Sequence, residues 1–181
     1  LPKDEKKKIA LFCSVPNESV ISMHDVDTVY SVPILLNKQK VDKTIIEKLK
    51  IKSKQPNLND WKRVVKAKLM PEKEVNVSFV GKYTELKDSY KSINEALEHA
   101  GIKNKAKVNI NFVEAENISS KNIKKTLKNA DAVLVPGGFG ERGIEGMILA
   151  CKYARENNIP YLGICLGMQV AIIEYARNVL K

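Results

Sequence analysis

A short apolar run turns sharply into a helix in the stretch Pro160-Tyr-Leu-Gly-Ile-Cys165-Leu-Gly-Met-Gln169. Residues 159–164 predict a buried strand, and the helical spacing of apolar side chains over residues 166–180 predicts the helix. Between them, Gly163-Ile-Cys165-Leu-Gly167 is a G-x-C-x-G version of the nucleophile elbow, in which the glycines leave room for a tight turn. Such a turn exposes the sulfur at the sheet edge, where the helix N-terminus favours a thiolate.

The alternative interpretation of Cys165 is a buried core cysteine, which is the commoner place for an isolated cysteine. A second glycine-rich stretch, Gly137-Gly-Phe-Gly-Glu-Arg-Gly143, follows another predicted strand. Both turns therefore fall at the carboxyl ends of strands, where ligands bind in parallel α/β sheets. Their coincidence favours a functional cysteine.

Strands and helices alternate regularly from Glu74 onward. We predict that Gly101 closes the first of these helices as its C′ residue. The alternation predicts an α/β fold in which a parallel sheet is covered by helices on both faces. The predicted strands are residues 75–80, 108–113, 132–135 and 159–164, and the predicted helices are residues 89–100, 119 or 120 to 127, 144–156 and 166–180.

The part of the chain before Glu74 reads differently. Residues 1–51 contain one convincing strand, at 9–13, and a helix at 44–49, so they cannot form a complete domain alone. Residues 52–73 are polar and lysine-rich and predict a linker with one helix over 59–69, capped by Asn59 or Asp60. We therefore divide the chain into residues 1–51, 52–73 and 74–181.

Composition excludes several classes of protein. The net charge of +10 comes mostly from scattered lysines, which favours a solvated surface over a nucleic-acid-binding one and leaves anionic small ligands possible. No apolar run approaches the roughly 20 residues that span a bilayer, so we expect no membrane partner. Three separated cysteines, Cys13, Cys151 and Cys165, argue against disulfides or zinc and for a reducing cytoplasm.

Acyl transfer through Cys165 would create an oxyanion, which two N–H donors can stabilise. Leu166, next to the cysteine, and Gly138, in the second glycine-rich stretch, are the predicted donors. A nucleophilic cysteine also needs a base, but His24 and His99 are poorly placed to reach it. The triad is therefore incomplete within this chain, and in elbow hydrolases its other members follow the nucleophile.

Motifs in both halves of the chain resemble those of known families. Pro136-Gly-Gly-Phe-Gly-Glu-Arg-Gly143 together with Asn158-Ile-Pro-Tyr-Leu-Gly-Ile-Cys-Leu-Gly-Met-Gln169 resembles the class I glutamine amidotransferase family. Lys8-Ile-Ala-Leu-Phe-Cys13 and Val20-Ile-Ser-Met-His-Asp-Val-Asp27 resemble the end of the amidoligase domain of the CTP synthase family. The stretches Leu58-Asn-Asp-Trp61 and Val80-Gly-Lys-Tyr83 fit that family as well.

The resemblance implies a flavodoxin-like amidotransferase core preceded by part of a P-loop-type amidoligase domain. It also implies that the nucleotide-phosphate loop precedes Leu1 and that the amidotransferase histidine and glutamate follow Lys181. The implied activity is ATP-dependent amination of UTP to CTP with ammonia from glutamine, a step of pyrimidine nucleotide biosynthesis. We expect negligible activity from this chain alone.

The resemblance also implies the roles of residues near the elbow. Cys165 would attack the glutamine amide, while the backbone at Gly138 and Leu166 stabilises the oxyanion. Gln169 would help to hold the substrate, and Phe139 would contribute to the same pocket wall.

In the first region, the resemblance implies that Lys8 contacts the UTP or CTP nucleotide, with Phe12 near its base. His24, Asp25 and Val26 match the segment that lines the ATP adenine site. Lys82 and Tyr83 would lie near the domain junction through which ammonia passes.

Further properties follow from the resemblance alone. Mg²⁺ would accompany ATP, with no metal ligand among the residues of this chain. GTP would act as activator and CTP as inhibitor of a cytoplasmic homotetramer, without nucleic acid or membrane partners. Two alternatives are another class I amidotransferase or stand-alone cysteine hydrolase on the same core, and a non-catalytic regulatory relative.

Overall fold

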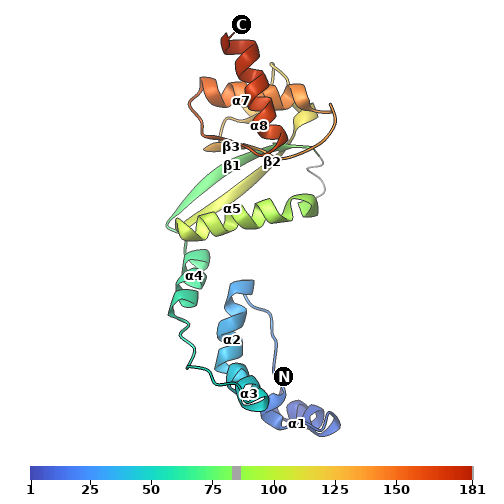
Figure 1. Cartoon of the computed structure of the whole chain (residues 1–181), viewed down its shortest axis with the longest axis vertical. Coiled ribbons are helices and arrows are strands. Elements are labelled where there is room, and N and C mark those ends of the chain that lie inside the picture. Colours follow the sequence, from blue (N-terminus) through green and yellow to red (C-terminus); the bar gives the residue numbers. More distant parts are fainter. Residues whose placement is uncertain (83–86, 181) are drawn as a thin grey trace. The chain divides into compact units, whose positions relative to one another are not determined.

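The computed structural model describes residues 1–82 and 87–180, and the chain divides into two compact units, Leu1–Pro71 and Glu72–Lys181. The first unit is helical in its described residues, whereas the second is built on a parallel sheet (Figure 1). The three-part division of the chain by composition stays a prediction.

The first unit contains four helices and a very small core. Ala10, Val20 and Thr28 are its buried residues. The side chain of Gln39 exchanges two 2.9 Å hydrogen bonds with the backbone of Ser22 and so ties the extended segment to the helices. The elements are α1 (Lys3–Phe12), α2 (Val32–Lys38), α3 (Val41–Leu49) and α4 (Asn59–Leu69), with 3₁₀ turns at Asn17–Ser19 and Val29–Ser31.

The strand predicted over residues 9–13 is wrong, because this segment is the last part of helix α1. A short apolar run does not distinguish strand from helix, and the lysines, alanine and leucine around it are good helix formers. No strand lies elsewhere among residues 1–71 to pair with it. The helix predicted over 44–49 is confirmed within α3.

Helix α4 has the predicted bounds but not the predicted cap. Leu58 occupies the N-cap position and makes no side-chain capping bond. The side chain of Asn57 instead accepts a 3.0 Å hydrogen bond from the N–H of Asn59. The cap prediction, Asn59 or Asp60, is therefore wrong by one or two residues.

The second unit contains a four-stranded sheet in the order β2–β1–β3–β4, with every neighbouring pair parallel. All four predicted strands are present, which confirms the α/β fold. Their bounds are β1 (Lys73–Gly81), β2 (Ala106–Glu114), β3 (Ala132–Val135) and β4 (Tyr161–Gly163). The long β1–β2 ladder pairs Gly81 with Glu114 at its carboxyl end, and β3–β4 pairs Val135 with Gly163.

Helices cover both faces of this sheet, as predicted (Figure 1). Helix α5 (Lys91–Lys103), after a 3₁₀ turn at Lys87–Tyr90, packs on one face. The other face carries α6 (Ile123–Thr126), α7 (Ile144–Glu156) and α8 (Leu166–Tyr175). A π-helical segment, Ala176–Leu180, continues α8, and a short 3₁₀ turn, Ala115–Asn117, follows β2.

Two helix predictions on this unit need correction. Gly101 lies inside α5 rather than beyond its end. A larger residue would not fit at this position, because a Cβ there would come 2.5 Å from the Ala106 carbonyl oxygen. This glycine therefore serves close packing of the helix on the sheet rather than helix termination. Helix α6 covers four residues instead of the predicted eight or nine, and the backbone before it is held by Asn122, whose side chain accepts from the N–H of Ser119.

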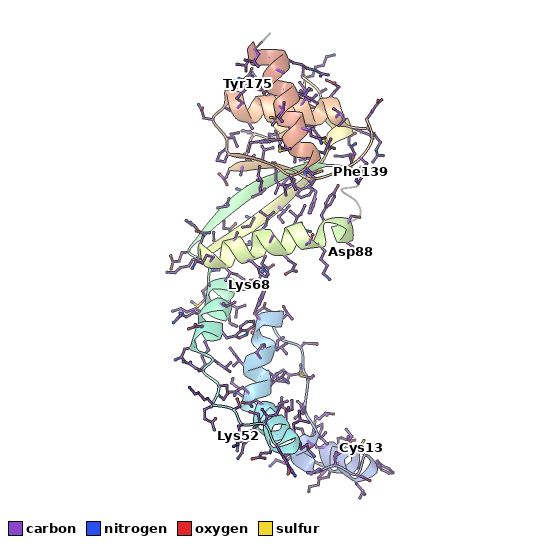
Figure 2. The ribbon with its side chains drawn as sticks, viewed as in Figure 1. Cys13, Lys52, Lys68, Asp88, Phe139 and Tyr175 are labelled. Carbon is purple, nitrogen blue, oxygen red and sulfur yellow. The ribbon has the colours of Figure 1, made fainter. Side chains whose placement is uncertain are left out.

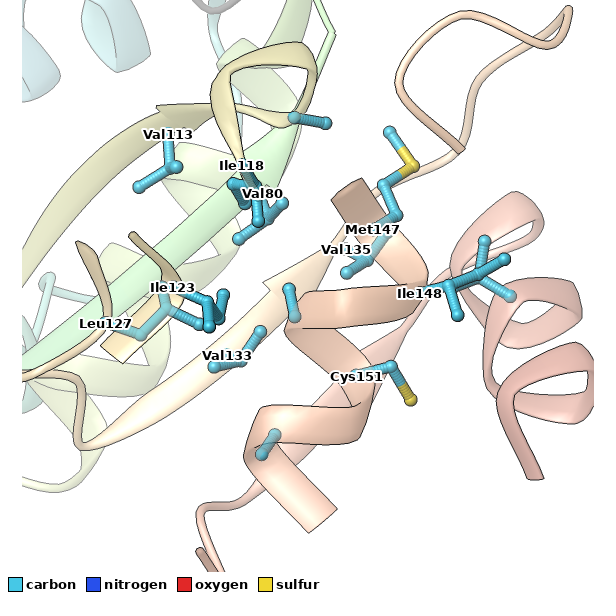
Figure 3. Close-up of a cluster of buried hydrophobic side chains, with 14 residues drawn as sticks. Val80, Val113, Ile118, Ile123, Leu127, Val133, Val135, Met147, Ile148 and Cys151 are labelled. Atoms are coloured by element: carbon cyan, nitrogen blue, oxygen red, sulfur yellow. The ribbon is translucent and has the colours of Figure 1, made fainter. Parts of the chain in front are cut away.

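Alternation along the strands divides the core between the two faces. Val77 and Phe79 of β1 point to the α5 side, where Leu134 joins them. Val80 of β1 and Val133 of β3 point to the opposite side. There they meet residues of α6, α7 and α8 in the larger cluster (Figure 3), which includes Ile123, Leu127, Val135, Met147, Ile148, Cys151 and Val170.

An ion pair between a buried carboxylate and a partly exposed guanidinium joins helix α8 to helix α7. The Glu174 side chain is 1% exposed, and Arg155 binds it through two parallel hydrogen bonds of 2.8 and 3.0 Å. A carboxylate is costly to bury without such a partner. The pair therefore fixes how the mostly apolar helix α8 lies against α7.

We expect Arg155→Met to lower the free energy of unfolding of the second unit by about 3 kcal/mol, because it leaves the Glu174 carboxylate buried without its partner. Urea unfolding followed by circular dichroism measures this, since the only tryptophan, Trp61, lies in the first unit. The matched control is Arg177→Met, whose pair with Glu145 is exposed and contributes less than about 1 kcal/mol. Equal losses in the two variants would contradict the prediction.

Cys151 belongs to the buried core of the second unit, whereas Cys13 and Cys165 are exposed. Burial first, and the nearby Glu174 carboxylate second, raise the pKa of the Cys151 thiol to about 11. Its thiolate is therefore scarce near neutral pH.

We accordingly expect iodoacetamide at pH 8 to label Cys13 and Cys165 at least about 100-fold faster than Cys151, because only an accessible thiolate reacts. Mass spectrometry of tryptic peptides measures the three rates. Labelling in urea is the control, since unfolding should make the three rates similar. Fast native labelling of Cys151 would refute the assignment of this residue to the core.

Candidate active site

Three chain segments converge at the carboxyl edge of the parallel sheet. Lys82 follows strand β1, Pro136 begins the glycine-rich stretch after β3, and Cys165 follows β4. Because β1 and β4 both pair with β3, these segments are neighbours. The structure thus brings the predicted nucleophile and the predicted donor loop, residues 136–143, to one place. We call this stretch the glycine loop.

Cys165 has the backbone of a nucleophile elbow. Its φ of 53° and ψ of −102° lie outside the regions that non-glycine residues favour. The turn is tight enough that a Cβ on Gly163 would come 2.4 Å from the backbone of Gly167. A Cβ on Gly167 would in turn come 2.1 Å from the Val135 carbonyl oxygen. These contacts explain both glycines of the motif, and Cys165 is left exposed at the start of helix α8.

The hydroxyl of Tyr161 supports this turn from β4. It donates a 2.8 Å hydrogen bond to the carbonyl oxygen of Gly167 in the first turn of α8. Burial raises the pKa of the Tyr161 phenol, which keeps it a hydrogen-bond donor well above neutral pH. The elbow is therefore held by both packing and a buried hydrogen bond.

The two predicted oxyanion donors lie beside each other and beside the cysteine. A Cβ on Gly137 would be 3.6 Å from the Cβ of Cys165, and one on Gly138 would be 3.2 Å from Cδ2 of Leu166. Leu166 is the first residue of α8, where a backbone N–H has no partner within the helix. The arrangement places both donor residues at the elbow, as an oxyanion site requires.

The other two residues predicted near the elbow, Phe139 and Gln169, are both exposed. Gln169 lies one turn into α8, and its backbone N–H donates to the Cys165 carbonyl oxygen at 3.2 Å. Phe139 stands at the glycine loop with 94% of its surface exposed (Figure 2). Their proposed contacts with substrate stay predictions.

Lys82 has a role that the sequence reasoning missed. Its side chain is only 2% exposed, and its ammonium donates to the carbonyl oxygens of Phe139 at 2.9 Å and Gly140 at 2.6 Å. Burial lowers the pKa of Lys82, nearby Arg142 lowers it further, and Glu116 opposes them. The hydroxyl of Tyr90 donates to the Lys82 carbonyl oxygen. The sequence feature that could have indicated these contacts is a lysine directly after a predicted buried strand. Tyr83, predicted beside it, lies outside the described residues.

A second contact holds the glycine loop from the side of strand β2. Arg142 approaches Glu116 at 3.2 Å and Glu114 at 3.9 Å. Glu114 ends β2, and Glu116 lies in the 3₁₀ turn after it. The glycine loop is thus joined to the end of β1 through Lys82 and to the end of β2 through Arg142.

His99 belongs to the same unit as the elbow but does not lie near it. His99 lies near the end of α5, two residues before Gly101, which contacts Ala106 at the amino end of β2. Cys165 lies at the opposite, carboxyl edge of the sheet. His24 belongs to the first unit and is exposed there.

The predicted nucleotide-binding residues are all in the first unit. Lys8 is exposed on α1 and approaches Glu5 at 3.4 Å, and Phe12 is also exposed. His24 and Asp25 are exposed and Val26 is half-buried in the extended segment that follows. A shallow cavity beside α1 has a volume of about 460 Å³ and is lined by Lys7, Ala10, Leu11, Ser14, Val15 and Asn17.

The described residues show neither a metal-binding cluster nor a membrane-spanning helix. Over residues 1–82 and 87–180, no three His, Cys, Asp or Glu side chains gather as a metal-binding group. Within the same ranges, none of the helices combines the length and apolarity needed to cross a membrane.

Comparison with known proteins finds family matches in two parts of the chain. Residues 1–51 match the family model of the CTP synthase N-terminus. A solved structure, the Trypanosoma brucei CTPS glutaminase domain with bound acivicin, is 43% identical, with a TM-score of 0.55. The match covers 59% of this chain and 42% of that one, so the chain spans about two fifths of its length. Residues 85–181, more than half of the chain, match the glutamine amidotransferase class-I family model, and the chain belongs to that family.

Proposed function

We propose that the full-length protein is a glutamine-hydrolysing CTP synthase. The observation that carries this proposal is the strained, exposed Cys165 beside the glycine loop, in a chain whose first 51 residues match the CTP synthase N-terminus. The solved neighbour is described as a glutaminase domain, which supports glutamine as the amide substrate.

In the proposed first reaction, the Cys165 thiolate attacks the amide carbon of glutamine. The carbonyl oxygen becomes an oxyanion, which the N–H groups of Gly138 and Leu166 stabilise. Collapse of this intermediate releases ammonia and leaves a thioester, which water hydrolyses to glutamate. Gln169 and Phe139 would hold the substrate, and the base would be the histidine–glutamate pair that the resemblance implies.

In the proposed second reaction, ATP phosphorylates O4 of UTP, and ammonia then displaces the phosphate to give CTP. Lys8 and Phe12 would contact the UTP or CTP nucleotide. His24, Asp25 and Val26 would line the adenine site. Lys8, Phe12, His24 and Asp25 are exposed and therefore open to a ligand, whereas Val26 is half-buried.

The remaining properties are also proposals. GTP would activate the enzyme, CTP would inhibit it, and the full-length protein would form a cytoplasmic homotetramer without nucleic acid or membrane partners. Mg²⁺ would accompany ATP. The described residues gather no carboxylate cluster that would fit this ion, so we assign none of its ligands to them.

The family match alone also fits another class I amidotransferase or a stand-alone cysteine hydrolase. The match of residues 1–51 favours CTP synthase over both. A non-catalytic regulatory relative is the third possibility, and the strained elbow argues against it, because such strain persists where function requires it.

We expect Cys165→Ala in the full-length protein to abolish CTP synthesis from glutamine, at least about 10³-fold, while synthesis from free ammonia continues. Cys13→Ala is the matched control, since Cys13 is also exposed but lies in the other unit. A spectrophotometric assay of CTP with each nitrogen source measures both activities. The 181-residue chain alone should release no measurable glutamate.

Glutamine-dependent synthesis that survives in Cys165→Ala would show that Cys165 is not the nucleophile. Glutamate release by the wild-type protein without any binding of ATP or UTP would favour the stand-alone hydrolase. An unreactive Cys165 in the full-length protein would favour the regulatory relative.

A further inference from the structure

The glycine loop lacks the intrinsic rigidity that an oxyanion site needs. Gly137, Gly138 and Gly140 give its backbone wide conformational freedom, and Gly140 adopts a positive φ of 75°. An N–H donor stabilises an oxyanion well only when it is fixed in place before the reaction. Something outside the loop must therefore fix the peptide at Gly138.

Lys82 is placed to do this. Its ammonium donates to the carbonyl oxygens of the two residues that follow Gly138, Phe139 at 2.9 Å and Gly140 at 2.6 Å. Its aliphatic part passes beside the donor residue itself, since a Cβ on Gly138 would be 4.0 Å from Cδ of Lys82. The lysine thus contacts the loop along three consecutive residues.

These hydrogen bonds are strong because the ammonium is buried. A charged donor makes shorter and stronger hydrogen bonds than a neutral one, and water competes little for a side chain that is 2% exposed. The lysine backbone is itself anchored, because the Tyr90 hydroxyl donates to its carbonyl oxygen. The pair of Arg142 with Glu116 holds the far end of the loop, four residues beyond Gly138.

We propose that Lys82 is a positioning residue for glutamine hydrolysis, which fixes the glycine loop so that the N–H of Gly138 faces the oxyanion formed at Cys165. The inference rests on the proposed function and deepens it. Lys82 touches neither substrate nor the reacting atoms in this scheme, and it acts through the loop backbone.

The test compares Lys82→Met, which keeps the length of the side chain but removes its donors, with wild-type full-length protein. We expect kcat for glutamate release to fall about 10–100-fold while KM stays within about 3-fold, because the oxyanion exists only in the transition state. Hydrogen exchange of peptides spanning residues 136–143 should become faster. CTP synthesis from free ammonia should be unchanged.

Three further variants sharpen the comparison. Lys82→Arg keeps a charged donor and should restore part of the lost kcat. If Lys82→Met does not fold, Lys82→Gln removes the charge but keeps a polar side chain, and it should show the same fall in kcat. Lys107→Met is the matched control, since Lys107 pairs with Glu74 on the exposed surface at 3.4 Å and should change nothing.

Three results would overturn the proposal. The first is an unchanged kcat or unchanged exchange of the glycine loop in Lys82→Met. The second is faster exchange across the whole second unit together with loss of ammonia-dependent synthesis, which would make Lys82 merely structural. The third is a wild-type protein that hydrolyses no glutamine, which would refute the proposed function and this inference together; the first two would refute the inference alone.

Discussion

Gly167 packs against the carbonyl of Val135 so closely that a Cβ on this glycine would lie 2.1 Å from the oxygen. This approach of helix α8 to the end of strand β3 leaves the chain between β4 and α8 almost no room to turn. Cys165 must then adopt a positive φ, and its side chain stays at the exposed edge of the sheet. The position of the thiol therefore follows from backbone packing two residues away.

Among its described residues, the second unit buries two charged side chains, Glu174 and Lys82, and each is stabilised in a different way. Glu174 has a bidentate charged partner, Arg155, and the pair joins two helices. Lys82 has neutral carbonyl partners, and it joins a strand end to a loop. A helix pair needs one fixed geometry for stability, whereas a glycine loop needs external contacts to have any fixed geometry at all.

Much of the second unit was predictable because local and global signals agree there. The strand at 132–135 and the helix at 144–156 have the predicted bounds, since each is an apolar segment with clear turn residues at its ends. Gly101 was misread because a glycine near a helix end has two explanations, termination or close packing, and only the position of Ala106 decides between them. The segment 9–13 failed for a similar reason, since a five-residue apolar run takes its structure from its neighbours.

The site was predictable in part, and the missing part has a physical cause. A tight turn requires glycines, so the elbow at Cys165 and the glycine-rich stretch beside it could be found from the sequence. The donor roles of Gly138 and Leu166 stay predictions. The support from Lys82 arises only when strands β1 and β3 lie side by side, because 57 residues separate this lysine from the carbonyl of Phe139. Backbone carbonyls exist at every residue, and no sequence pattern marks the ones that a buried ammonium will choose. The rigid half of the site is thus encoded locally, while the flexible half depends on a contact that only the fold creates.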